Sequence, residues 1–75
     1  MSTKVTPGRI IVKPRDSRGW MMITGRAHWE MYFHSRQRAI QFARAYARLN
    51  RPSTLQVVGG SGDLEVEESF GDSLA

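Results

Sequence analysis

Residues 35–52 read SRQRAIQFARAYARLNRP, and apolar side chains recur in this segment every three or four positions. That period places them along one side of an α-helix and leaves polar side chains on the other. Three alanines on the apolar side are spaced by four residues and favour close packing on a sheet: Ala39, Ala43 and Ala47. Ser35 fits the N-cap, because its hydroxyl can accept a hydrogen bond from an early backbone N–H. Pro52 closes the segment, so we expect one helix from Arg36 to about Asn50.

Strands are expected on both sides of this helix. Five short segments fit strands: 9–15, 20–24 and 29–33 before the helix, and 54–58 and 64–68 after it. This order predicts an α+β fold, in which an antiparallel sheet of about five strands (β-β-β-α-β-β) carries one helix packed on one face. We expect a single small domain over residues 9–71, with a flexible leader at 1–8 and a flexible tail at 72–75.

The two faces of the predicted sheet differ, because one helix covers only one of them. The side chains expected to face the helix are Ile10, Val12, Met22, Met31, Phe33, Leu55, Val57, Leu64 and Val66. The opposite face then carries apolar candidates for an interface, of the kind that marks a contact surface: Ile11, Met21, Ile23 and Tyr32, with Val58 nearby. A register shift of one residue in any strand would exchange its faces. A chain of 75 residues buries only about 60% of its unfolded surface, so we expect a homodimer formed through this face.

Charge is divided unevenly along the chain. Residues 1–51 hold all 11 Lys and Arg against two acids, a balance of +9, whereas residues 52–75 hold five acids and no base, a balance of −5, and the net charge is +4. Most of the bases are Arg, whose planar guanidinium suits phosphate and carboxylate groups. Clustered Arg in a chain with a pI near 10.4 indicates nucleic acid as a partner. The alternative is that the acidic end neutralises the basic part, within one chain or across a dimer.

Seven basic residues are candidate nucleic-acid contacts, four on the helix and three on the first strand: Arg36, Arg38, Arg44, Arg48, Arg9, Lys13 and Arg15. Arg36 and Arg38 stand in the first helical turn, where a cation is slightly unfavourable unless an anion is held there. Carboxylates of the same chain are the alternative partners: Glu65, Glu67 or Asp72. Arg48, in the last turn, complements the helix dipole without any ligand. Contacts to phosphates position a protein without reading bases, so we expect weak sequence specificity.

The basic side chains of the first strand allow a second interpretation. They lie beside Tyr32, and Trp29 is on the same predicted strand as Tyr32, so this face could stack single-stranded bases. It could equally be a dimer face whose bases meet Glu65 and Glu67 of the second copy. A different class of function is a protein-interaction module, an accessory or inhibitor protein that captures an acidic partner through its sheet face or an exposed strand edge.

Catalytic and metal-binding motifs are missing from the sequence, so we expect a protein that is not an enzyme and needs neither a cofactor nor a metal. The absence of Cys excludes a disulfide framework and thiol chemistry. His28 and His34 would lie about 20 Å apart along a strand, too far for one ion. No apolar run approaches the roughly 20 residues of a membrane span, and no signal sequence opens the chain. We therefore expect a cytoplasmic, bacterial protein.

An ordered set of residues extends through most of the chain: Gly19-Trp20, then Ser35, Ala39, Ile40, Ala43-Arg44 and Ala47, then Val57, Gly59, Gly62, Leu64, Glu68, Ser69, Phe70 and Gly71. This set resembles a small bacterial family of unknown function, number twenty-one eighty-eight in the domain-of-unknown-function series. The likeness runs from Ile10 to Gly71 and implies a compact sheet with one Ala-rich helix, but it supplies no catalytic residues. Four positions depart from the Thr, Asp, Asp and Tyr of that family: Ser35, Ser61, Glu68 and Phe70.

Overall fold

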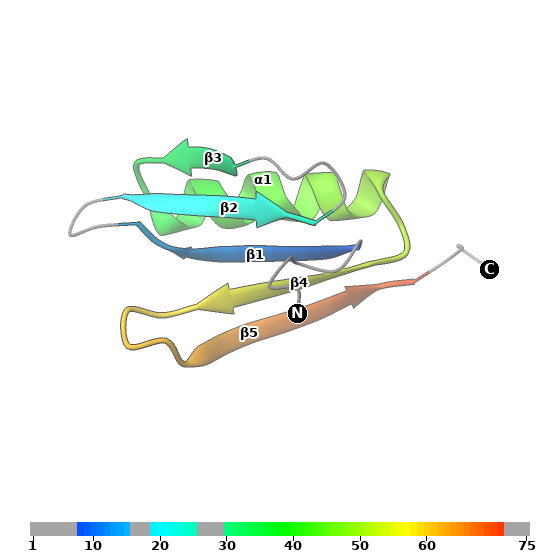
Figure 1. Cartoon of the computed structure of the whole chain (residues 1–75). Helices are drawn as coiled ribbons and strands as arrows, with labels where there is room; N and C mark the ends of the chain where they lie inside the picture. Colours follow the sequence, from blue (N-terminus) through cyan, green and yellow to red (C-terminus); the bar gives the residue numbers. More distant parts are fainter. Residues whose placement is uncertain (1–7, 16–18, 26–29, 72–75) are drawn as a thin grey trace.

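The computed structural model describes residues 8–15, 19–25 and 30–71, which form one five-stranded sheet and one helix (Figure 1). In chain order the elements are β1 (Arg9–Pro14), β2 (Trp20–Thr24), β3 (Glu30–Phe33), α1 (Arg36–Leu49), β4 (Ser53–Val58) and β5 (Leu64–Phe70). The predicted α+β class, with one helix packed on a sheet of five strands, is confirmed. Of the predicted leader and tail, only Gly8 lies within the described residues.

The sheet is mixed, with the strand order β3-β2-β1-β4-β5. The pairs β1–β2, β2–β3 and β4–β5 are antiparallel, as predicted, but β1 and β4 run parallel. The prediction of a wholly antiparallel sheet is therefore wrong at the central pair. The physical reason is the crossover made by α1, which carries the chain from β3 across the sheet so that β4 enters beside β1 in the same direction.

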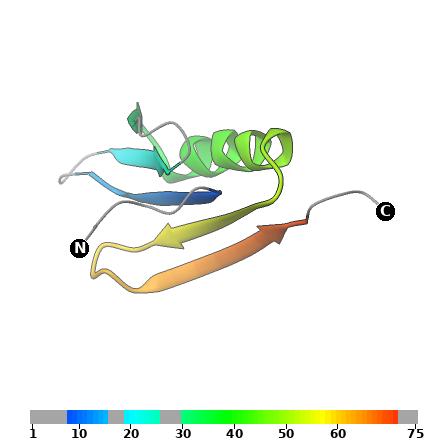
Figure 2. The ribbon, with the colours of Figure 1, turned by 45° about the vertical axis from the view of Figure 1, so that its right-hand side comes forward.

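The core lies between α1 and one face of the sheet (Figure 2). Its buried side chains are Ile10, Val12, Met22, Leu55 and Val57 from the strands, and Ala39, Ile40, Ala43 and Ala47 from the helix. The small alanine side chains allow α1 to pack closely over β1, β2, β3 and β4. Met31, Phe33 and Val66 pack against this core while partly buried. The predicted helix-facing set is confirmed except at one position.

That exception is Leu64, which was expected to face the helix and instead leaves 52% of its surface exposed. The register of β4 with β5 shifts between Val57, which pairs with Val66, and Val58, which pairs with Leu64. This irregularity places one extra residue, Glu65, in β5 and reverses the face of Leu64. The turn before it contains Gly62 in the left-handed region (φ +90°), a conformation that favours glycine.

Both ends of α1 are capped, and the sequence predicts the cap at Ser35. Ser35 Oγ accepts a hydrogen bond from the backbone N–H of Arg38 at 3.1 Å, and Ser35 itself has extended backbone angles. At the other end, the backbone N–H of Asn50 bonds to the carbonyl of Tyr46 at 3.0 Å. The buried Ser53 hydroxyl donates to the carbonyl of Ala47 at 2.9 Å, which links the end of α1 to the start of β4. These bonds satisfy backbone groups that a helix end otherwise leaves without partners.

Candidate functional site

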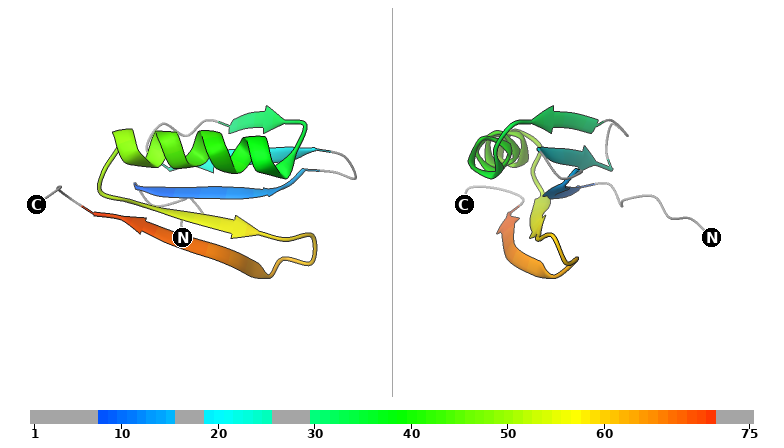
Figure 3. Two further views of the ribbon diagram at one scale, coloured as in Figure 1. Left: turned by 180° about the vertical axis from the view of Figure 1, so that it is seen from behind. Right: turned by 90° about the vertical axis from the view of Figure 1, so that its left-hand side faces the viewer.

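The seven basic residues predicted to contact nucleic acid lie on opposite sides of the molecule. Four of them are on α1, and three are on β1 or directly after it: Arg36, Arg38, Arg44 and Arg48, and Arg9, Lys13 and Arg15. Alternation along β1 directs the second group away from α1, because Ile10 and Val12 between them face the core. Figure 3 shows α1 on one side of the sheet with β1 behind it. A ligand lying flat against one side therefore meets one group and not the other.

Two of the helix arginines are held by carboxylates of β5. Arg36 Nη2 lies 3.0 Å from Glu65 Oε1, and Arg44 Nη2 lies 2.6 Å from Glu68 Oε2. Arg44 Nε also donates to both oxygens of Glu68, at 3.0 and 3.2 Å, so this second pair is bidentate. These hydrogen bonds lower the pKa of Glu68 below its ordinary value. Pairing within the chain, left open by the sequence for Arg36, is what the structure shows.

Arg38 and Arg48 remain exposed on the outer side of α1. Within residues 8–15, 19–25 and 30–71, neither guanidinium forms an ion pair with a carboxylate. Arg38 borders a hollow of about 330 Å³ together with Phe33, Gln41 and Phe42. Arg48 lies in the last turn of α1, and its charge also lowers the pKa of Glu68, after the larger effect of Arg44. The helix thus offers two guanidinium groups to an anion from solvent.

The four residues predicted to form an interface lie together on the face that α1 leaves uncovered. Ile11 pairs with Ile23 across β1 and β2, and Met21 pairs with Tyr32 across β2 and β3. Lys13 stands opposite Met21, so a base borders the apolar patch. Ile11, Met21 and Ile23 are half-buried by their neighbours, although no described element packs on them. The uncovered face therefore has an apolar centre on its middle strands.

Tyr32 is the exposed ring on this face, with 53% of its surface accessible. Its hydroxyl donates to Glu30 Oε1 at 2.8 Å, and this hydrogen bond raises the pKa of the phenol, which stays neutral near pH 7. The Arg15 guanidinium lies over the ring, 4.1 Å from its centroid. Trp29 and His28 lie outside the described residues. Because Arg15 already occupies one side of the ring, Tyr32 can stack a base on the other side only.

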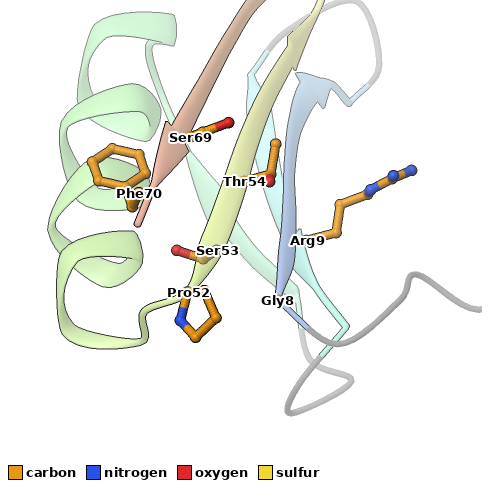
Figure 4. A pocket seen from close by; sticks show the side chains of 7 residues that line it. All are labelled: Gly8, Arg9, Pro52, Ser53, Thr54, Ser69 and Phe70. Carbon is orange, nitrogen blue, oxygen red and sulfur yellow. The ribbon is translucent and has the colours of Figure 1, made fainter. Parts of the chain in front are cut away.

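A depression of about 320 Å³ lies where β1, β4 and β5 meet at one end of the sheet (Figure 4). It is lined by Gly8, Arg9, Pro52, Ser53, Thr54, Ser69 and Phe70. Figure 4 shows Arg9 directed away from α1 and Phe70 directed toward it. The register aligns Arg9 with Thr54 and Thr54 with Ser69, which brings a guanidinium and two hydroxyls to one edge of the uncovered face. None of these lining side chains is a carboxylate or imidazole that could act as a general base.

A groove of about 500 Å³ runs between α1 and β5. Its lining is Arg36, Gln37, Ile40, Gln41, Arg44 and Val66, with the aliphatic side chains as its apolar part. The sequence did not identify Glu68 as the partner of Arg44. The available signal was a match of spacing, since Arg36 and Arg44 lie about 12 Å apart along a helix and Glu65 and Glu68 about 10 Å apart along a strand. That match can be used only once α1 is known to run alongside β5 and Glu65 is known to be an extra residue in the register, because residues three apart in a regular strand face opposite sides.

Residues 8–15, 19–25 and 30–71 contain no group of three or more His, Asp and Glu side chains placed to hold a metal ion. In the same ranges, no helix has the length and apolar character needed to cross a membrane.

Comparisons with protein-family models, with curated proteins and with solved structures found no match. The resemblance to family number twenty-one eighty-eight therefore stays a prediction. Function has to be inferred from the placement of the charged and apolar side chains, in particular the arginines of α1 and the uncovered face of the sheet.

Proposed function

We propose that this protein is a non-catalytic nucleic-acid-binding protein that contacts phosphates through the arginines on the outer side of α1. The observation that carries the proposal is the charge of this helix: four Arg and no acidic residue between Arg36 and Leu49. Such a surface attracts a polyanion and releases its counterions on binding. Contacts of this kind are weakly sequence-specific.

The helix side is a better phosphate surface than the uncovered sheet face. On the helix side, Glu65 and Glu68 already hold Arg36 and Arg44, whereas Arg38 and Arg48 form no ion pair among the described residues. The uncovered face carries three bases, but it also carries two acidic side chains, Glu30 and Glu67. Its centre is apolar and is formed by Ile11, Met21 and Ile23. This mixture of charged and apolar side chains suits contact with another protein better than contact with a phosphate backbone.

The test is a titration of a fluorescent 16-base-pair DNA with the full chain at several salt concentrations. If Arg38 and Arg48 supply the contacts, log K should fall with log salt with a slope of about −1.8. The double variant Arg38→Ala/Arg48→Ala should lose most of this slope. The matched control Arg9→Ala/Lys13→Ala removes the same charge from the other face and should change the slope little. Equal losses from both variants would assign binding to net charge, and no binding at low salt would overturn the proposal.

A second candidate function is self-association through the uncovered face. The observation that favours it is the contiguous apolar set formed by Ile11, Met21 and Ile23 in register across β1 and β2. Charges around this set complement each other, with Lys13 on the central strand and Glu30 and Glu67 on the outer strands. Two copies packed face to face would bury the patch and bring the bases of one copy near the acids of the other.

Light scattering during size-exclusion chromatography measures this self-association directly. We expect a mass near twice 8.5 kDa for the wild type and a monomer for Ile23→Lys, with the circular dichroism of the variant unchanged. Leu49→Lys places the same charge on an exposed position of α1 and should leave the dimer intact. A monomeric wild type at high protein concentration would exclude the dimer. Capture of an acidic protein is less well supported at the β5 edge, because the Glu67 carboxylate there is hydrogen-bonded to the neutral Gln56 and would repel such a partner.

A further inference from the structure

The outermost line of α1 is formed by four residues spaced by three, four and three positions. They are Arg38, Gln41, Ala45 and Arg48, and all four are exposed. At 3.6 residues per turn this spacing places them in one row along the helix axis, opposite the buried alanines of the core. The row runs about 15 Å from Arg38 to Arg48. It has cationic ends and a middle formed by an amide and a methyl group.

The shape of the molecule makes this row accessible to a large ligand. Figure 3 shows α1 as the outermost element on its side of the sheet, with β3 set back on one side of it and β5 curving toward it on the other. With 14 residues, α1 is about 21 Å long, and an α-helix with side chains is about 10–12 Å across. The major groove of B-form DNA is about 12 Å wide and about 8.5 Å deep, so a single helix fits it.

We propose that the nucleic acid bound by this protein is B-form duplex DNA and that α1 enters its major groove. This inference rests on the function proposed above and adds the class of nucleic acid and the groove. Gln41 faces the base edges and can bond in a bidentate manner to adenine, while the small Ala45 side chain lets the helix approach thymine methyl groups. Arg38 and Arg48, one at each end of the row, reach the phosphates.

The placement of the other arginines agrees with this orientation. Glu65 and Glu68 hold Arg36 and Arg44 toward β5, away from the outer row, and compensate the charge of these two arginines. The carboxylates on the helix side of β5 are thereby prevented from repelling a DNA strand that passes beside α1. The absence of any acidic residue in α1 means that no carboxylate of the helix itself faces the groove.

Other nucleic acids fit this surface less well. The major groove of A-form RNA is deep and too narrow for side chains to read, so α1 could not enter it as it enters the major groove of B-form DNA. Single strands are bound largely by stacking on exposed rings. On the outer side of α1, Phe42 packs against Phe33 with ring centroids 5.5 Å apart, and on the uncovered face Arg15 covers Tyr32. Both rings are partly exposed, but Phe42 is on α1 and Tyr32 is on the uncovered face, so they cannot form one stacking platform.

The test compares binding of the full chain to four labelled nucleic acids of the same mixed sequence. These are a DNA duplex, an RNA duplex, a DNA single strand, and a DNA duplex in which 7-deazapurines replace adenine and guanine. The modified bases remove the N7 acceptors from the major groove and leave the phosphates unchanged. We expect the unmodified DNA duplex to bind best, with a loss of about fivefold or more on 7-deazapurine substitution.

Two matched variants locate the contact. Gln41→Ala should bind both DNA duplexes with the same reduced affinity, whereas Gln56→Ala, a glutamine on the opposite face of the sheet, should keep the difference between them. Equal affinity of the wild type for the RNA duplex, or for the 7-deazapurine duplex, would overturn the major-groove inference and leave the proposed phosphate binding intact. Failure to bind any of the four at low salt would remove the proposed function as well.

Discussion

Glu68 determines how much of the Arg44 charge a polyanion can use. Its carboxylate accepts from Nε and Nη2 and offsets the charge of the guanidinium, so a phosphate gains little from Arg44 while the pair is formed. Glu68→Gln keeps the shape of the side chain and removes its charge. We expect this variant to bind duplex DNA more tightly and to steepen the dependence of log K on log salt by about 0.9. Fluorescence anisotropy at several salt concentrations measures both changes.

The matched control for this prediction is Glu67→Gln. Glu67 has the same charge and lies in the same strand, but its carboxylate accepts a hydrogen bond from Gln56 on the opposite face. An equal gain from the two substitutions would indicate a general effect of net charge. A gain confined to Glu68→Gln would identify Glu68 as a group that masks Arg44.

The same carboxylate gives the folded chain a pH dependence. The hydrogen bonds from Arg44 lower the pKa of Glu68 in the folded state below its ordinary value of 4.5. A carboxyl group with a lowered folded pKa stabilises the fold above its unfolded pKa and loses this contribution as the pH falls through the folded pKa. We expect the melting temperature of the wild type to fall more steeply below about pH 4.5 than that of Glu68→Gln. Thermal unfolding followed by circular dichroism between pH 7 and pH 3 compares the two, and parallel curves would contradict this role of the pair.

Two alanines of α1, at 43 and 45, separate the role of the helix in the fold from its role at the surface. Ala43 is fully buried against the sheet, whereas Ala45 is exposed in the outer row. Ala43→Leu should destabilise the fold by about 1–3 kcal/mol, because the added side chain overpacks the core. Ala45→Leu should change the free energy of unfolding by less than about 0.5 kcal/mol. Urea denaturation measures both free energies of unfolding. Similar losses of stability in the two variants would mean that α1 is rotated on the sheet and does not bury Ala43 in preference to Ala45.

The elements themselves were predictable, because each follows from a local pattern. The spacing of Ala39, Ala43 and Ala47 and the cap at Ser35 determine α1, and alternation identifies the strands and gathers Ile11, Met21, Ile23 and Tyr32 on one face. The parallel pairing of β1 with β4 was missed, because a strand's alternation reads the same in both directions. Leu64 was misplaced because a register shift of one residue leaves no clear mark in the sequence. The Arg44–Glu68 pair joins elements whose relative placement depends on the whole fold.

At the scale of the whole molecule, the two proposed surfaces are on opposite sides and do not compete. Two copies packed through their uncovered faces would place their sheets about 10 Å apart, with each α1 on the far side of its own sheet. The two outer rows would then face in opposite directions. A short straight duplex that occupies one α1 cannot reach the other, so each copy should bind DNA independently.

This arrangement predicts two duplexes per dimer. With saturating 12-base-pair DNA at low salt, light scattering should give the mass of two chains and two duplexes, and titration should show no cooperativity between the sites. Ile23→Lys should change the complex to one chain with one duplex while leaving the affinity per chain nearly unchanged, because Ile23 lies on the face opposite α1. A dimer saturated by a single duplex would show that both helices reach the same DNA. The face-to-face arrangement would then be wrong, since it turns the two copies of α1 away from each other.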